Sequence, residues 1–244
     1  MARFLLSVLL AALVAGCAPS RDLVGVVAAA HPGAVFSVPA CSRVVALTLD
    51  DGPDPRHTPA VLDVLARHGA RATFFVVGER VEAHPEVVAR AVAEGHELGL
   101  HGWTRDPALL LGSARTVRDL DRLAPLVEGF GPVRWVRPSV GFYTPAIRRA
   151  AEARGWRLAL GSVYPNDAWV PWTAWLAQAV LRDVRPGGVI VLHDGLGTRT
   201  RAAAVLDRVL PALARRGYRV TTLSDLVDTA RPCPTGGPRS DTAD

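Results

Sequence analysis

Residues 44–53 read VVALTLDDGP, and this stretch decides the fold. Its first six residues form a short apolar run with β-branched side chains, which predicts a buried strand. Two adjacent carboxylates, Asp50 and Asp51, follow directly, and Gly52-Pro53 predicts a turn. In α/β proteins, sites lie at the carboxyl ends of such strands, so these two carboxylates are the first candidate site residues.

Working outward from this strand, strand-like and helix-like segments alternate along the chain. We expect further strands at residues 72–77, 97–100, 133–137, 158–163, 188–192 and 219–222. We expect helices between them at residues 58–68, 85–93, 112–126, 145–154, 172–183 and 201–216. This alternation implies parallel βαβ units with right-handed crossovers. It predicts a single α/β domain built as a distorted (β/α)7-type barrel, with an open doubly wound sheet as the alternative.

The two ends of the chain differ in character from this middle part. Residues 1–16 combine Arg3 with an apolar stretch too short to span a membrane, which predicts a secretory signal peptide. Val14-Ala15-Gly16-Cys17 resembles a bacterial lipobox, which implies a membrane partner through a lipid on Cys17; an ordinary signal peptide is the alternative. The expected divisions are signal peptide 1–16, lipid anchor and linker 17–40, folded domain 41–228 and disordered tail 229–244.

The charge and cysteine content of the chain limit its possible partners and compartments. All 28 basic residues are arginine, against 23 acidic residues, which gives a formal net charge of +5. Because the arginines alternate with acidic residues and form no basic block, we expect no nucleic-acid partner. If the chain is exported, Cys41 and Cys233 lie in an oxidising compartment, where they either form a disulfide or remain free thiols.

Further polar side chains recur at the carboxyl ends of the predicted strands. After the two aspartates of the first strand come His101, Arg137, Asp167 and His193. Each has a structural explanation when taken alone: a solvated turn, a core histidine or a buried ion pair. Their convergence on one rim predicts instead a site for metal binding or proton transfer. No glycine-rich fingerprint or P-loop follows the first strand, which weighs against a nucleotide enzyme.

In these segments the sequence resembles the polysaccharide deacetylases of the NodB-homology type, carbohydrate esterase family 4. The resemblance covers about residues 44–227, and it rests on LTLDDGP at 47–53, ATFFV at 72–76, GHELGLH at 95–101, Arg137-Pro138 with Gly141, NDAW at 166–169 and VLHDG at 191–195. It implies a NodB-type barrel that hydrolyses acetyl groups from an N- or O-acetylated cell-envelope glycan, acting as a monomer.

The resemblance also implies a role for each matching residue. Asp50 is the expected general base, held by Arg137, and His193 is the expected general acid. Asp167 is expected to tune Arg137 or His193. A backbone N–H near Val140 is expected to bind the oxyanion, and Leu192 with Trp169 or Trp103 is expected to form the pocket for the acetyl methyl group.

The family's metal site is implied only in part. Asp51 and His101 match two of its ligands for a divalent cation, expected to be zinc, which would lower the pKa of a bound water. Arg105 stands where a second histidine belongs, and it cannot be a ligand because it stays protonated. The neighbouring Asp106 is the expected replacement ligand; otherwise the metal binds weakly or is absent.

Two further interpretations stay open. The first is a catalytically weak or inactive glycan-binding domain of the same fold, which the arginine at position 105 favours. The second is a hydrolase of the same fold that acts on a non-sugar amide or ester.

Overall fold

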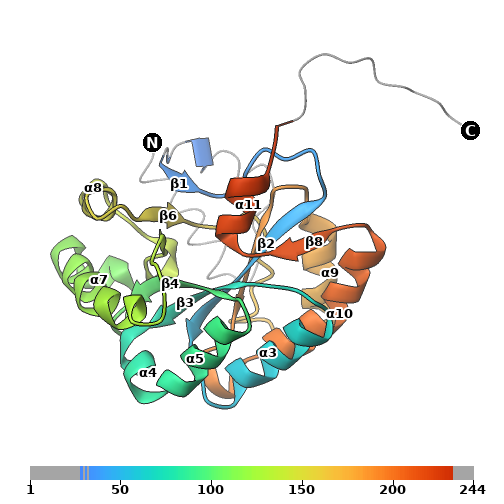
Figure 1. Ribbon diagram of the computed structural model, residues 1–244, viewed down its shortest axis with the longest axis horizontal. Helices are drawn as coiled ribbons and strands as arrows, with labels where there is room; N and C mark the ends of the chain where they lie inside the picture. Colours follow the sequence, from blue (N-terminus) through green and yellow to red (C-terminus); the bar gives the residue numbers. More distant parts are fainter. Residues whose placement is uncertain (1–27, 30, 32, 233–244) are drawn as a thin grey trace, which may run out of the picture.

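The computed structural model describes residues 28–29, 31 and 33–232. The predicted signal peptide, Cys17, Cys233 and residues 233–244 of the predicted tail lie outside the described residues. Within them the chain forms a sheet with helices arranged around the outside of its strands (Figure 1).

In the described part of the chain, eight strands form one sheet in which every ladder is parallel. They are β1 (Ala34–Val35), β2 (Val44–Gly52), β3 (Thr73–Val77), β4 (Glu97–Gly102), β5 (Trp135–Val136), β6 (Arg157–Ala159), β7 (Val189–His193) and β8 (Arg219–Thr221). Their order is β1-β6-β5-β4-β3-β2-β7, and β8 pairs with β2. The expected single α/β domain is confirmed, but no ladder closes the barrel. Among the described residues, two isolated bridges, Val163 to Ile190 and Ser37 to Gly188, link the β1–β6 side of the sheet to β7 and the residue before it.

The helices lie where the alternation predicted them, with three short additions. They are α3 (His57–Arg67), α4 (Gly78–Ala83), α5 (Pro85–Ala93), α6 (Ala108–Leu111), α7 (Ser113–Glu128), α8 (Pro145–Glu152), α9 (Thr173–Asp183), α10 (Ala202–Arg215) and α11 (Leu223–Thr229), with the 3-10 turns η1 (Ser139–Gly141) and η2 (Gly197–Arg199). The additions, α4, α6 and α11, are too short to show a helical period in the sequence. Across the described ranges, none of these helices has the length and apolar character needed to span a bilayer.

Alternation along the strands divides the buried side chains into two groups. Leu47 and Leu49 of β2 belong to the larger core, which includes apolar side chains of α3 and α10. Val44 and Ala46 point the other way and pack with Leu223 of α11, among others, in a second cluster. The same alternation places Asp50 on the side of Val44 and Ala46, at the opposite end of the strand from α11. This face of β2 therefore has packed apolar side chains at its start and a carboxylate at its carboxyl end.

The packed domain extends further towards the N-terminus than expected. We expected a linker up to residue 40, but β1 pairs with β6, and Phe36 is buried in the larger core. The Cys41 N–H donates a hydrogen bond to the Arg231 carbonyl at 3.0 Å, which brings the two ends of the domain together. Cys41 takes part in a disulfide. Its expected partner, Cys233, lies outside the described residues.

Candidate active site

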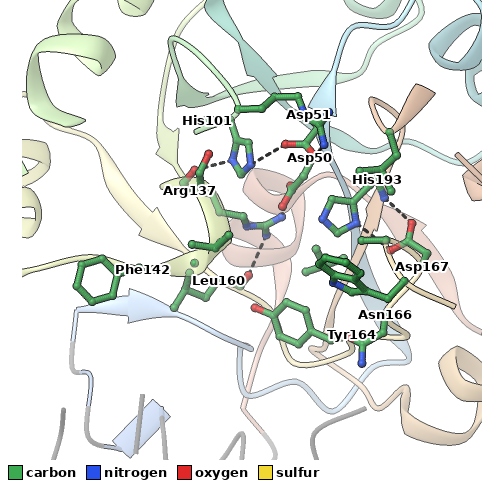
Figure 2. Close-up of a pocket in the computed structure, with 18 of the residues that line it drawn as sticks. Asp50, Asp51, His101, Arg137, Phe142, Leu160, Tyr164, Asn166, Asp167 and His193 are labelled. Carbon is green, nitrogen blue, oxygen red and sulfur yellow. Dashed lines mark hydrogen bonds and ion pairs between the residues drawn. The ribbon is translucent and has the colours of Figure 1, made fainter. Parts of the chain in front are cut away.

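A cavity of about 260 Å³ lies at the carboxyl ends of the strands. Six of the predicted site residues line it: Asp50, Asp51, His101, Arg137, Asp167 and His193. Figure 2 shows Asp50 and Asp51 between His101 on one side and His193 on the other. The parallel register sets Asp50 beside His193, because the two are paired across β2 and β7. The structure therefore brings these six residues, from separate segments, into one site.

Arg137 holds Asp50 in a fixed position. Its Nη1 donates to Asp50 Oδ1 at 2.6 Å and to Thr48 Oγ1 at 2.8 Å. Its Nε and Nη2 donate to the backbone carbonyls of Ala159 and Leu160, at 3.0 and 2.9 Å. A buried guanidinium needs this degree of pairing, since an unpaired buried charge is costly. Arg137 uses only Oδ1 of Asp50, which leaves Oδ2 as a proton acceptor.

Asp167 holds His193 in the same way on the other side. Asp167 Oδ2 accepts the backbone N–H of His193, and Oδ1 lies 2.8 Å from the ring Nδ1. Burial alone would lower the pKa of His193, but the charge and hydrogen bond of Asp167 outweigh burial. The charges of Asp50 and Asp51 act in the same direction, so the pKa of His193 rises to about 10. His193 is therefore an imidazolium at neutral pH and can donate a proton.

Asp51 lies between His101 and Arg105. His101 Nδ1 donates to the Arg137 carbonyl at 2.6 Å, and the ring Nε2 lies 3.4 Å from Asp51 Oδ1. Arg105 Nη2 lies 3.2 Å from the other oxygen, Asp51 Oδ2. Burial alone would raise the pKa of Asp51, but the hydrogen bond and charge of His101 outweigh burial. The charges of His193 and Arg105 act in the same direction, so the pKa of Asp51 lies well below its usual range.

The structure does not bring Asp106 to this pair. Asp106 is exposed, it accepts a hydrogen bond from Thr104 Oγ1 at 2.8 Å, and it does not line the cavity. Among the residues that the structure describes, no group of three or more His, Cys, Asp and Glu side chains is placed to hold a metal ion. Catalytic zinc sites use three protein ligands. Two donors beside a guanidinium do not fit a resident divalent cation, because Arg105 already provides the positive charge that neutralises Asp51.

The backbone around the cavity is strained. Asp51, Val140 and Asn166 are the non-glycine residues with positive φ in the described ranges, at 73°, 56° and 65°, and all three line the cavity. Such conformations are rare, above all for a β-branched residue, and they cluster at functional sites. Gly195 makes the turn at Asp51 possible, since a Cβ there would lie 1.9 Å from the Asp51 carbonyl oxygen.

An apolar wall completes the cavity, and it differs in part from the expected one. Trp169 lines it as expected, together with residues not expected in the wall: Phe142, Leu160, Tyr164 and Val191. Leu192 does not line it, because it faces away from the side of β7 that carries Val191 and His193. Trp103 does not line it either: it packs under Arg122, whose Cζ lies 3.3 Å from the ring centroid. Burial raises the pKa of Tyr164 to about 12, so its hydroxyl stays neutral.

Three known proteins are similar to this chain over most of its length. The peptidoglycan-N-acetylglucosamine deacetylase of Bacillus cereus is 33% identical over 200 residues, which cover 79% of this chain and 92% of that protein. The chitooligosaccharide deacetylase of Sinorhizobium fredii is 35% identical over 192 residues, 73% of this chain and 89% of that protein. The solved family 4 acetyl xylan esterase from Clostridium thermocellum, in complex with a cobalt ion, has a TM-score of 0.70 and 30% identity, and it covers 76% of this chain and 90% of its own.

The family model for polysaccharide deacetylases matches residues 37–159, which include β2, the carboxylate pair, His101 and Arg137. Together with the parallel sheet and the similarity over most of the relatives' length, this match shows that the chain belongs to the polysaccharide deacetylase family.

Proposed function

We propose that this protein hydrolyses acetyl groups from an N- or O-acetylated cell-envelope glycan. The observation that carries the proposal is a proton acceptor and a proton donor side by side in one cavity. Asp50, held by Arg137, is the acceptor, and His193, held by Asp167, is the donor. Peptidoglycan and chitooligosaccharides are the first substrates to test, because two relatives are named for acting on them.

The reaction proceeds through two proton transfers. Asp50 takes a proton from a water molecule as the water oxygen attacks the acetyl carbon, and the carbonyl electron pair moves onto the carbonyl oxygen. The tetrahedral intermediate collapses with cleavage of the bond to the sugar nitrogen or oxygen. His193 gives that atom its proton, which leaves acetate and a free amine or hydroxyl. Arg137 and Asp167 act as positioning residues for Asp50 and His193.

The apolar wall accommodates the acetyl methyl group. Phe142, Leu160 and Trp169 present apolar surface to the cavity, and Tyr164 adds a neutral ring. The zinc ion implied by the family resemblance is not part of this mechanism, because Asp51 and His101 alone do not make a site for it. The inactive glycan-binding alternative is not favoured, since the acid and the base are both in place.

The protein works at the cell envelope in this proposal. The peptidoglycan named in the Bacillus cereus relative supports an exported protein. The expected signal peptide and the lipid anchor on Cys17 fit this location and remain predictions, as does the monomeric state.

Asp50→Asn tests the function. We expect acetate release from chitooligosaccharides and peptidoglycan fragments to fall by about 100-fold or more, the usual contribution of a general base. The thermal unfolding curve should remain close to that of the parent. Asp63→Asn, a matched change at an exposed ion pair with Arg90, should leave turnover unchanged. Activity retained in Asp50→Asn would exclude the assigned base.

A further inference from the structure

Arg105 is a cation built into the rim of the cavity. Its side chain is 35% exposed, it lines the same cavity as Asp50 and His193, and its Nη2 lies 3.2 Å from Asp51 Oδ2. Within the described part of the chain, Asp51 is its ion-pair partner. A guanidinium carries five N–H donors in a planar fork, so contact with Asp51 leaves donors for a ligand in the cavity.

Arg137, the arginine beside the proposed base, is already largely committed to the protein. Arg137 directs four of its five N–H donors to Asp50, to Thr48 and to two backbone carbonyls. It is 2% exposed and stacks on the Phe75 ring, with its Cζ 4.1 Å from the ring centroid. Arg137 is therefore held mainly by the protein and orients the base, whereas Arg105 has most of its donors left for substrate.

Each of the three carboxylates of the site has a cationic partner in the protein. Arg137 pairs with Asp50, Arg105 with Asp51, and His193 with Asp167. A divalent cation between Asp51 and His101 would lie beside the Arg105 guanidinium and be repelled by it. His101, fixed by the Arg137 carbonyl, orients Asp51, and Asp51 in turn anchors Arg105.

We propose that Arg105 is a catalytic residue that stabilises the oxyanion in a metal-free deacetylation. This inference rests on the proposed function. When water attacks, the electron pair of the acetyl C=O moves onto the oxygen, and free N–H groups of Arg105 donate to that oxygen. Proton transfer to Asp50 and from His193 completes the hydrolysis as described above. Asp51 and His101 are positioning residues for the guanidinium.

Zinc binding tests, without any substrate, whether the charge of Arg105 takes the place of a metal ion. Calorimetry of zinc added to chelator-treated protein should show no one-to-one micromolar site in the parent. Arg105→His removes the cation and adds a third donor, so it should create a one-to-one site. A tight site in the parent, or none in a folded Arg105→His variant, would overturn the proposal. This result is independent of whether acetate release is found.

Kinetics test the catalytic role. Acetate release by the parent should change less than twofold after metal stripping or on addition of zinc or cobalt. Arg105→Met, similar in length but uncharged, should lower kcat by about 100-fold, the typical effect of losing one oxyanion donor. Arg148→Met is the matched control, because Arg148 is equally exposed at 35% and pairs with Glu152 on the surface of α8.

Two kinetic outcomes would overturn the role of Arg105. One is activity that disappears on stripping and returns with metal; the other is an Arg105→Met variant as active as the Arg148→Met control. If the parent releases no acetate under any condition, the proposed function fails, while the zinc titration still decides whether Arg105 excludes the metal.

Discussion

Replacing Asp167 with asparagine should narrow the pH range of activity from the alkaline side. His193 must carry a proton to act as the acid, and activity is lost as the pH rises through its pKa. That pKa lies at about 10, raised above the ordinary value by Asp167 in particular. The asparagine amide would keep one acceptor for the backbone N–H of His193 but would turn its N–H₂ group towards the ring Nδ1. The lost negative charge and the misplaced donor both disfavour the imidazolium.

The size of the shift follows from the ion pair. Two unit charges about 4 Å apart at an effective dielectric constant of about 20 interact by about 4 kcal/mol, or roughly 3 pKa units. His193 is 24% exposed, and Asp50 and Asp51 continue to favour its protonated form. We therefore expect the pKa of His193 to fall by about 2 units in the Asp167→Asn variant.

The assay is the pH dependence of kcat/KM for acetate release, which reports groups of the free enzyme. The alkaline limb should move down by about 2 units, while the acid limb stays in place. Asp63→Asn serves again as the control. An alkaline limb that does not move, in a variant that unfolds like the parent, would show that His193 is not the acid or that Asp167 does not set its protonation.

Two other changes test the turn and the apolar wall. Gly195→Ala should destabilise the protein by about 1 to 3 kcal/mol in thermal unfolding, because the new Cβ would lie 1.9 Å from the Asp51 carbonyl oxygen. Gly131→Ala, with open space around the added Cβ, should have little effect; equal losses would contradict the argument. Trp169 is 61% exposed at the cavity, so Trp169→Ala should raise KM for glycan oligomers by about 3- to 10-fold, the worth of one aromatic contact. A small acetyl ester should show no such rise, and a fall in kcat instead would contradict a binding role.

Most of the fold could be predicted from the sequence, because the patterns that mark strands and helices are local. Apolar runs and helical periods mark the elements, and parallel pairing then forces residues that follow separate strands onto one edge. Asp50 and His193 could be predicted to meet for this reason, and β2 and β7 pair them directly. β1 could not be predicted, because Ala34–Val35 is too short to show alternation and gains its place only by pairing with β6.

The details of the site depended on directions that a sequence does not specify. Position 105 was recognised as a lost ligand, but nothing in the sequence showed that its guanidinium turns towards Asp51 while the next side chain, Asp106, turns back to Thr104. The prediction that Leu192 lines the pocket was wrong, and strand alternation in the sequence could have shown that it faces away from His193. Strand alternation also places Thr48 on the same face as Asp50, so its contact with Arg137 could have been predicted from the sequence.

The hydrogen bonds of Arg137 have a consequence for how this site can change over generations. Arg137 joins β5 to β2 and to the carbonyls of Ala159 and Leu160, so it is a brace of the barrel as well as a support for the base. Purifying selection for a folded chain alone would preserve the orientation of Asp50. Arg105 does not support the barrel in this way, since its ion pair is with one carboxylate, Asp51, on the rim. A substitution of Arg105 can therefore change the chemistry of the site without loosening the fold, whereas a substitution of Arg137 affects both.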